Sequence, residues 1–462
     1  MRILEEIRRS GYFWLPDTPD EKIPGHLIIK NGGKIELEIV GHFGGENGYF
    51  NDDVNFDRII GHIEKDGLVT LDKCFYLQKN FSFGGISKSR VCVNFVYSGV
   101  AYDKDEAPTF DTLRFSVDCL DEWVGISGIT VTPDYEKRTS TISYEPKDTI
   151  LFKIDDQTQL QIIFAYTIPG SATLTEAKIT QRIYLRIISQ VLVPLNVLTE
   201  YAYKIQNLIC FATDRTVSIK DVSATSTEIL EKMQEGEQRP VPIQIYYQSA
   251  PFSEKEPAVK HFDMLFTFGQ IKNKFESIIQ KWFGAYDDLS PSLSLYFSVR
   301  NGGQKHYEGR FLALAQGLET FHRRTSQEKL MEDGDFSALV AEIMKGCPLG
   351  KEEWLRGRLE HGNEINLRKR ITRIIEPFKD IIGNSTDRRK IISRIVDTRN
   401  YLTHYNEDLK DSAASGLELY ALCRKMEAIF QLQFLKILGF SESEITTIVG
   451  NFRSLKDKLS NT

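Results

Sequence analysis

Two side chains that can do chemistry together lie near the C-terminus of the chain. Arg399 and His404 bound a six-residue stretch whose intervening residues are uncharged. An arginine is permanently charged, and its planar fork can bind two phosphate oxygens and stabilise charge that grows on them. A histidine titrates near neutral pH and can act as a general base or a general acid. The pair predicts proton transfer at a phosphate group. Asn400 has three possible roles: its amide could bind the phosphate, it could orient the histidine, or the residue could simply lie at the end of a helix.

The residues before this stretch predict an amphipathic helix. Four apolar residues recur at helical spacing within 387–398, so the stretch lies at or near the end of that helix. Five steps of roughly 100° place Arg399 and His404 about 140° apart around a regular helix. The two side chains then do not share one face. Either the helix kinks or frays there, or the site combines residues from two chains.

The pattern Arg-x4-His, with Asn400 directly after the arginine, resembles the signature of HEPN nucleases. Residues 397–405 are similar to the ApeA-like branch of that family. Members of this branch resemble anti-phage defence proteins, so the resemblance implies a role in defence. The resemblance implies that Arg399, Asn400 and His404 are catalytic. It also implies a homodimer, or a higher homo-oligomer built through the HEPN domain, in which two motifs face one cleft.

Cleavage of RNA is one reaction that these residues can perform without a metal or a cofactor. RNA carries its own nucleophile, the 2′-OH, which attacks the adjacent phosphorus after a general base removes its proton. The products are a 2′,3′-cyclic phosphate and a 5′-OH, and DNA is inert because it lacks the 2′-OH. We therefore predict a metal-independent RNA endonuclease that acts in anti-phage defence by abortive infection, with a phage-derived trigger at the N-terminal domain.

Two other functions are compatible with the sequence. One is a non-catalytic HEPN module that binds RNA or a partner protein, and the other is a carbohydrate- or protein-binding β-sandwich with a helical dimerisation domain. The intact Arg-Asn-x3-His set favours the nuclease, because a module that only binds need not keep both side chains. Glu319 and His322-Arg323 also resemble the family, and we expect Glu319 to pair helices or support the site.

The composition is typical of a soluble globular protein, with 41% hydrophobic and 26% charged residues. The net charge of -6 gives no overall signature of nucleic-acid binding. Residues 351–404, however, carry 13 Lys and Arg against 8 Asp and Glu, a net charge of +5. A locally basic surface suits a polyanion, although a solvated helical face explains the charge equally well.

The cysteines and the apolar runs predict a cytoplasmic protein without a membrane segment. The six cysteines have neither CxxC nor zinc-site spacing, so we expect reduced thiols and no metal site. No stretch reaches the roughly 18 apolar residues of a membrane span. The first fourteen residues include five charged side chains and have no apolar signal-peptide core.

The fold class predicted from the residues is α+β. Short β-branched runs separated by turn residues, such as 34–40, predict a mainly antiparallel β-sandwich-like or barrel-like domain at the N-terminus. From residue 307 onward the apolar spacing is helical, and it predicts an all-α bundle, which the resemblance identifies as a HEPN domain. We expect three parts: a β-rich sensing or regulatory domain over 1–300, the HEPN bundle over 301–440, and a helical tail over 441–462. The first part is expected to contain helices over 188–212 and 271–283, and also a strand over 264–268.

Overall fold

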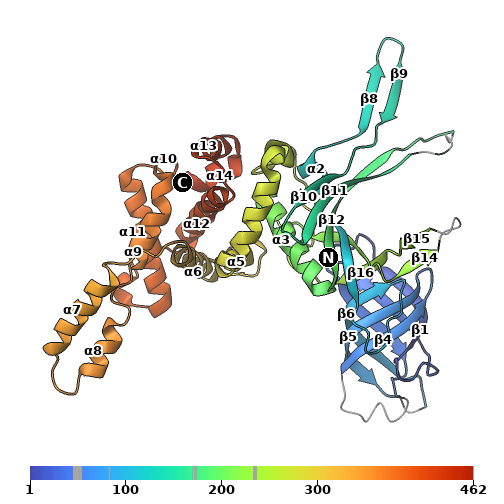
Figure 1. Cartoon of the computed structure of the whole chain (residues 1–462), viewed down its shortest axis with the longest axis horizontal. Coiled ribbons are helices and arrows are strands. Elements are labelled where there is room, and N and C mark those ends of the chain that lie inside the picture. Colours follow the sequence, from blue (N-terminus) through green and yellow to red (C-terminus); the bar gives the residue numbers. More distant parts are fainter. Residues whose placement is uncertain (45–54, 83, 169, 171–173, 233–236, 461–462) are drawn as a thin grey trace. The chain divides into compact units, whose positions relative to one another are not determined.

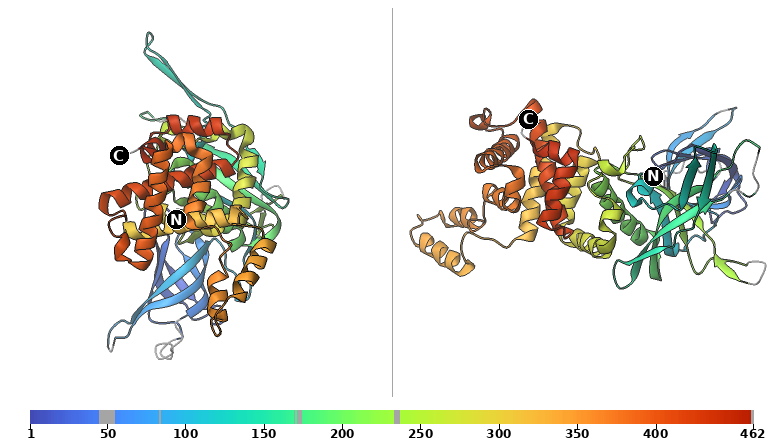
Figure 2. Two further views of the ribbon diagram at one scale, coloured as in Figure 1. Left: turned by 90° about the vertical axis from the view of Figure 1, so that its left-hand side faces the viewer. Right: turned by 90° about the horizontal axis from the view of Figure 1, so that it is seen from above.

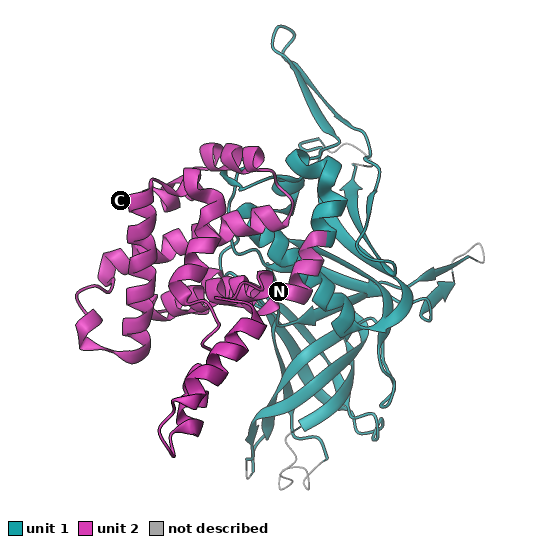
Figure 3. Ribbon diagram, turned by 60° about the vertical axis from the view of Figure 1, so that its left-hand side comes forward, with its two compact units in different colours: residues 1–280 teal, residues 281–462 magenta. Residues whose placement is uncertain are grey.

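The chain forms two compact units. A computed structural model describes residues 1–44, 55–82, 84–168, 170, 174–232 and 237–460. Figure 3 colours the units, which comprise Met1–Gln280 and Lys281–Thr462. The predicted fold class is confirmed, because an antiparallel β domain precedes an all-α region.

Unit 1 is built on an antiparallel sheet of 12 strands (Figure 1). Its strands are β1 Ile7–Trp14, β2 Ile23–Lys30, β3 Lys34–Val40, β4 Asn55–Ile63, β5 Gly67–Asn80, β6 Lys88–Ser98, β7 Thr109–Val117, β10 Ile150–Lys153, β11 Thr158–Thr167, β12 Thr180–Pro194, β13 Ile219–Thr225 and β16 Ile243–Tyr247. Separate two-stranded pairs are β8 Ile129–Asp134 with β9 Thr139–Tyr144, and β14 Leu230–Lys232 with β15 Gln238–Pro240.

The first six strands close into a ring. Their order is β6-β3-β2-β1-β4-β5, and β5 pairs again with β6. The alternation that predicted a strand over 34–40 is confirmed in β3, where Ile35, Leu37 and Ile39 are buried. Phe13 is fully buried directly opposite Gly61. A Cβ at Gly61 would lie only 2.6 Å from the phenyl group of Phe13. The closed set of strands therefore needs a glycine beside this buried aromatic side chain.

The other six strands extend the sheet from β6 in the order β16-β13-β7-β12-β11-β10. Helix α3, Leu195–Thr213, packs against β7 and β12, and the short helix α2, Leu120–Val124, lies against α3. The hairpin of β8 and β9 extends away from the sheet, and almost all of its residues are exposed (Figures 1 and 2).

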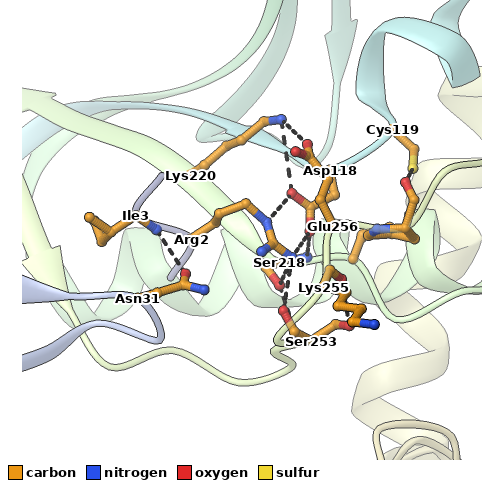
Figure 4. A network of polar contacts seen from close by, with 12 residues as sticks. Arg2, Ile3, Asn31, Asp118, Cys119, Ser218, Lys220, Ser253, Lys255 and Glu256 are labelled. Carbon is orange, nitrogen blue, oxygen red and sulfur yellow. Dashed lines mark hydrogen bonds and ion pairs between the residues drawn. The ribbon is translucent and has the colours of Figure 1, made fainter. Parts of the chain in front are cut away.

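A buried ion pair joins four separate segments of unit 1 (Figure 4). Arg2 donates through Nε and Nη2 to both carboxylate oxygens of Asp118, at 2.7 and 2.8 Å. Nη2 also reaches the hydroxyl of Ser218 and, at 2.8 Å, the carbonyl of Ser253. The backbone N–H of Ser218 donates to Asp118 at 2.9 Å. Both charges are therefore satisfied although both side chains are almost inaccessible to solvent.

Two expectations for this unit are wrong in detail. The helix expected over 188–212 begins only at Leu195, because β12 continues to Pro194. The register of β12 shifts between Ile188 and Val193, and this irregularity breaks the alternation and mimics helical spacing. The strand expected over 264–268 is absent from this described stretch. Its apolar residues are buried, but the N–H of Leu265 donates to Ala212 at the end of α3 rather than to a strand.

Unit 2 is helical. The short helical segments η1 His261–Asp263, α4 Phe268–Ile271 and η2 Lys272–Lys274 precede it at the end of unit 1. The longer helices are α5 Phe275–Arg300, α6 Tyr307–Thr325, α7 Asp333–Lys345, α8 Glu352–Leu359, α9 Leu367–Ile375, α11 Ser385–His404, α12 Gly416–Ile437, α13 Glu442–Asn451 and α14 Arg453–Leu459, with η3 Glu376–Phe378, α10 Lys379–Ile382 and η4 Glu407–Leu409 between them.

The core of unit 2 is the group of α6, α9, α11 and α12, which pack on one another. Phe311, Leu314 and Phe430 are among its fully buried side chains. Helices α7 and α8 form a hairpin that stands off this core, and neither contains a buried residue (Figure 2).

The helix expected over 271–283 is longer than predicted. It is part of α5, which begins at Phe275 and runs through Gly284 and Pro291 to Arg300. Burial of Tyr286 and Leu293 continues the packed face beyond the glycine, so tertiary contacts outweigh the roughly 1 kcal/mol that a helical glycine costs. The division between the units falls inside α5, whereas the domain limits at 300 and 440 stay a prediction.

Candidate functional site

Helix α11 carries the predicted motif at its C-terminal end. Its first turn is capped by Asn384, whose side-chain oxygen accepts hydrogen bonds from the N–H groups of Thr386 and Asp387, at 2.9 and 3.0 Å. The buried face of the helix consists of Ile391, Ile392, Ile395 and Thr398. Of the four apolar residues that predict the helix, the three isoleucines thus face the core and Val396 is half-buried. The residues of the motif follow directly.

A buried hydroxyl fixes the end of this helix. Thr398 is fully buried, and its Oγ1 accepts a hydrogen bond of 2.8 Å from the N–H of Ala414. The segment between α11 and α12 is thereby fastened to the residue that precedes Arg399. This contact limits how far the motif can move relative to the core.

Arg399 lies between an amide and a carboxylate. Its Nη1 donates to Oδ1 of Asn400 at 3.2 Å, and its Nη2 lies 3.9 Å from Oε2 of Glu319 on α6. The side chain of Arg399 is 35% exposed, so the guanidinium can still be reached from solvent. The structure therefore brings Arg399 and Asn400 together. Glu319, expected to support the site, supplies a counter-charge from a second helix.

His404 is the last residue of α11 and is exposed. The helix continues up to it without a break, and the N–H of Tyr405 still donates to the Tyr401 carbonyl at 2.6 Å. Thr403 Oγ1 also donates to the Arg399 carbonyl, at 2.7 Å. Tyr405 then ends the helix with a left-handed φ of 49°. The alternative in which the helix kinks or frays before His404 is therefore wrong for this chain. Within the described parts of the chain His404 has no hydrogen bond or ion pair with Arg399 or Asn400.

A charged network links Arg399 to side chains of α6, of α9 and of the segment before α9. Arg323 donates to Oε1 of Glu319 at 3.2 Å and also to Oε2 of Glu364. Arg370, which is 4% exposed, donates to the same Glu364 oxygen at 3.3 Å. The hydrogen bond from Arg323 lowers the pKa of Glu364. Sequence reasoning missed Glu364 and Arg370, although the spacing of Glu319 and Arg323 is that of an i,i+4 helical ion pair.

Metal ligands do not cluster in the part of the chain that the structure describes. No group of three or more His, Cys, Asp or Glu side chains there could hold a metal ion. All six cysteines are free thiols, and four of them are buried. Among the described residues, no helix combines the length and the apolar character that crossing a bilayer requires.

Comparison with known proteins defines the class. Residues 8–282 match the family ApeA N-terminal domain 1, and residues 312–444 match the family Apea-like HEPN. The first match covers the closed sheet and its extension, and the second covers the core helices with the motif. The chain therefore belongs to the ApeA-like HEPN family. No curated protein and no solved structure matches the chain.

Proposed function

We propose that the chain is a metal-independent RNA endonuclease that acts in anti-phage defence by abortive infection. The observation that carries this proposal is the placement of the Arg-Asn-x3-His set at the accessible end of α11 in a HEPN bundle. Arg399 and Asn400 are paired there, and His404 is exposed beside them in sequence. If these three side chains were buried, or if the arginine were fully paired with carboxylates, they could not contact an RNA strand.

Each residue has a separate role in the proposed reaction. His404 transfers the proton, either from the attacking 2′-OH or to the leaving 5′ oxygen. Arg399 binds two oxygens of the phosphate and stabilises the charge that grows on them. Asn400 keeps the guanidinium oriented through its hydrogen bond of 3.2 Å. The reaction cleaves the P–O5′ bond, forms a P–O2′ bond and leaves a 2′,3′-cyclic phosphate and a 5′-OH.

The site is proposed to form between two chains. On a regular helix, His404 projects about 140° away from Arg399, so one motif cannot place both side chains on one phosphate. A two-fold dimer of HEPN bundles gives each phosphate an arginine and a histidine from facing motifs. We propose that residues 301–440 form this dimer, and that residues 441–462 are an appended helical tail.

The N-terminal domain is proposed to control the site. Unrestrained RNA cleavage would harm the host cell, so the nuclease needs a device that keeps it inactive before infection. The β-rich region over 1–300 takes this role in our proposal, with a phage-derived trigger and a cytoplasmic site of action.

The experiment that tests the function is a cleavage assay with matched substrates. Purified protein is incubated with an RNA, with the same RNA carrying 2′-O-methyl groups and with the matching DNA, each with and without EDTA. We expect cleavage of the unmodified RNA alone, unaffected by EDTA, and 2′,3′-cyclic phosphate ends. Cleavage that requires magnesium would exclude the proposed chemistry. RNA binding without cleavage, under conditions where the protein is toxic to cells, would favour a non-catalytic binding module.

A further inference from the structure

One face of the extended sheet in unit 1 carries two arginines side by side. Arg114 on β7 lies directly opposite Arg186 on β12 in the register of the two strands. Side chains that are paired in this way project from the same face of a sheet, and their Cα atoms are about 4.5–5.5 Å apart. The neighbouring Leu113 and Leu185 are buried in the core of the unit. The two arginines therefore lie on the opposite face, where both are partly exposed.

Uncharged groups hold both side chains in place and leave donors unused. The guanidinium of Arg114 lies over the ring of Tyr184, 4.7 Å from its centroid. Arg186 donates to Oε1 of Gln161 through Nη2 and, at 2.8 Å, through Nε. The Nε of Arg114 is buried and has no hydrogen-bond partner. Within the described part of the chain, the terminal nitrogens of Arg114 make no hydrogen bond either. The two guanidiniums are thus positioned for a ligand that accepts hydrogen bonds.

No carboxylate balances these two charges. Among the described residues, neither Arg114 nor Arg186 has an ion-pair partner. By contrast, Arg2 and Arg58 in the same unit each bind a carboxylate through two nitrogens. Like charges directly opposite one another destabilise a sheet. Burial, and after it the charge of Arg114, lowers the pKa of Arg186. The sheet therefore keeps two cations together at a cost in stability, and an anion bound to both would offset that cost.

We propose that Arg114 and Arg186 together bind a phosphomonoester group. Such a group carries about −1.5 to −2 charges at pH 7 and three acceptor oxygens, so it can accept hydrogen bonds from both guanidiniums at once. A carboxylate or a phosphodiester has a single negative charge and would balance only one of the arginines. The phosphomonoester can belong to a small molecule or to the end of a nucleic acid, and the test distinguishes these two sources.

Calorimetry and thermal melting of the full chain test the proposal, in a buffer free of phosphate and sulfate. The two phosphomonoester probes are glycerol 3-phosphate and a thymidine dinucleotide with a 5′-phosphate, which has no 2′-OH to support cleavage. We expect binding that raises the melting temperature. Binding of glycerol 3-phosphate alone would indicate a small-molecule ligand, and binding of the dinucleotide alone would indicate a nucleic-acid end. Dimethyl phosphate and the dinucleotide without its 5′-phosphate should bind at least about 10-fold more weakly, because each lacks the dianionic group.

Three variants locate the site. Arg114→Gln and Arg186→Gln should each weaken binding by roughly 10- to 100-fold, because each removes charge-assisted hydrogen bonds. Arg182→Gln is the matched control, since Arg182 is an exposed arginine of the same strand, β12, roughly 13 Å along it from Arg186. Arg186→Gln should also raise the melting temperature in the absence of anions, because it removes the repulsion between the two cations. An arginine with only a structural role would have the opposite effect when it is replaced.

Four results would overturn the proposal. The first is that neither phosphomonoester binds at about 10 mM. The second is that the compounds without a phosphomonoester bind equally well. The third is that Arg182→Gln weakens binding as much as Arg114→Gln and Arg186→Gln do, and the fourth is that Arg186→Gln lowers the melting temperature without anions. Binding at this site does not depend on the proposed nuclease function. If wild type binds glycerol 3-phosphate and never cleaves RNA, the nuclease proposal fails while the binding site stands.

Discussion

The surroundings of Arg399 explain why an arginine suits this position. One nitrogen of the guanidinium donates to Asn400, and another lies beside Glu319 at the distance of a loose ion pair, 3.9 Å. Such a partner orients the side chain without the close bidentate contact that would occupy the fork. The outward edge of the guanidinium can then bind phosphate. A lysine has no planar fork and could not keep both contacts.

Protonation of His322 is expected to make the folded state less stable at mildly acidic pH. Its pKa is lowered by burial and by Arg370, with further contributions from Glu328, Arg373 and Arg323, of which only Glu328 opposes the shift. The unfolded chain therefore binds a proton that the folded chain does not. Stability is full above the ordinary histidine pKa near 6.5 and decreases as the pH falls through it.

The measurement is a series of thermal melts between pH 8 and about pH 5.5. His322→Gln is the informative variant, because its amide oxygen can still accept from Arg370 and does not titrate. We expect the melting temperature of the variant to depend less on pH than that of wild type. Parallel curves for the two proteins would show that His322 contributes nothing to the acid sensitivity.

Among the elements, α11 depends on a single buried hydroxyl at its end. Thr398→Val keeps the shape of the side chain but leaves the N–H of Ala414 without its acceptor. We expect a loss of about 1–3 kcal/mol in the free energy of unfolding of unit 2. Urea unfolding measures it, with the exposed Thr403→Val as control. If Thr398→Val left the free energy of unfolding unchanged, other contacts would hold the connection to α12.

The sheet of unit 1 depends on the buried pair of Arg2 and Asp118. Asp118→Ala leaves an uncompensated buried arginine, and we expect it to cost about 3–5 kcal/mol. Asp66→Ala removes the partner of Arg9 in a more exposed pair of similar length, 2.8 Å, and should cost no more than about 1 kcal/mol. Urea unfolding followed by circular dichroism compares the two variants. Equal effects would contradict the assigned role of the buried pair.

The elements that sequence alone predicts best are those whose periodicity is uninterrupted. Strand β3 has a strict alternation, and its bounds were predicted correctly. At the end of β12 a register shift disturbs the alternation, so the sequence predicts a helix where the strand continues. For α5 the sequence predicts an end before Gly284, because only the buried contacts beyond this residue show that the helix continues.

For the site too, the sequence predicts local features and not the contacts between distant segments. Residues 399–404 are local in sequence, so the motif and its helix could be predicted together. Glu364 and Arg370 come from other segments, and only the packing of α6 against α9 brings them to Arg323. The relation of His404 to the arginine of a second chain depends on assembly and stays a prediction.

The whole molecule is expected to be a dimer. The regular end of α11 keeps Arg399 and His404 on different faces of one helix, so a second motif must complete the site. Sedimentation at micromolar concentration should give twice the chain mass of 52.9 kDa. A crosslink between cysteines introduced at His404 should join two chains. A monomer, or a dimer whose motifs cannot be crosslinked, would contradict a composite site.

We propose that Arg399 and His404 cleave RNA, and the direct measurement is the cleavage rate of purified variants, with thermal melts alongside. His404→Ala should lower the rate by about 10²–10⁴-fold and Arg399→Ala by roughly 10²–10³-fold. The double variant should be little worse than the worse single variant, because both side chains act on one step. Arg399→Lys should also lose most activity, since an ammonium lacks the planar fork.

Two exposed residues serve as controls in that measurement. His306→Ala and Arg453→Ala remove the same types of side chain from exposed positions of unit 2 and should cleave at the wild-type rate. We expect loss of cleavage in the variants of Arg399 and His404, with melting temperatures close to wild type. Cleavage by His404→Ala at the wild-type rate would contradict it.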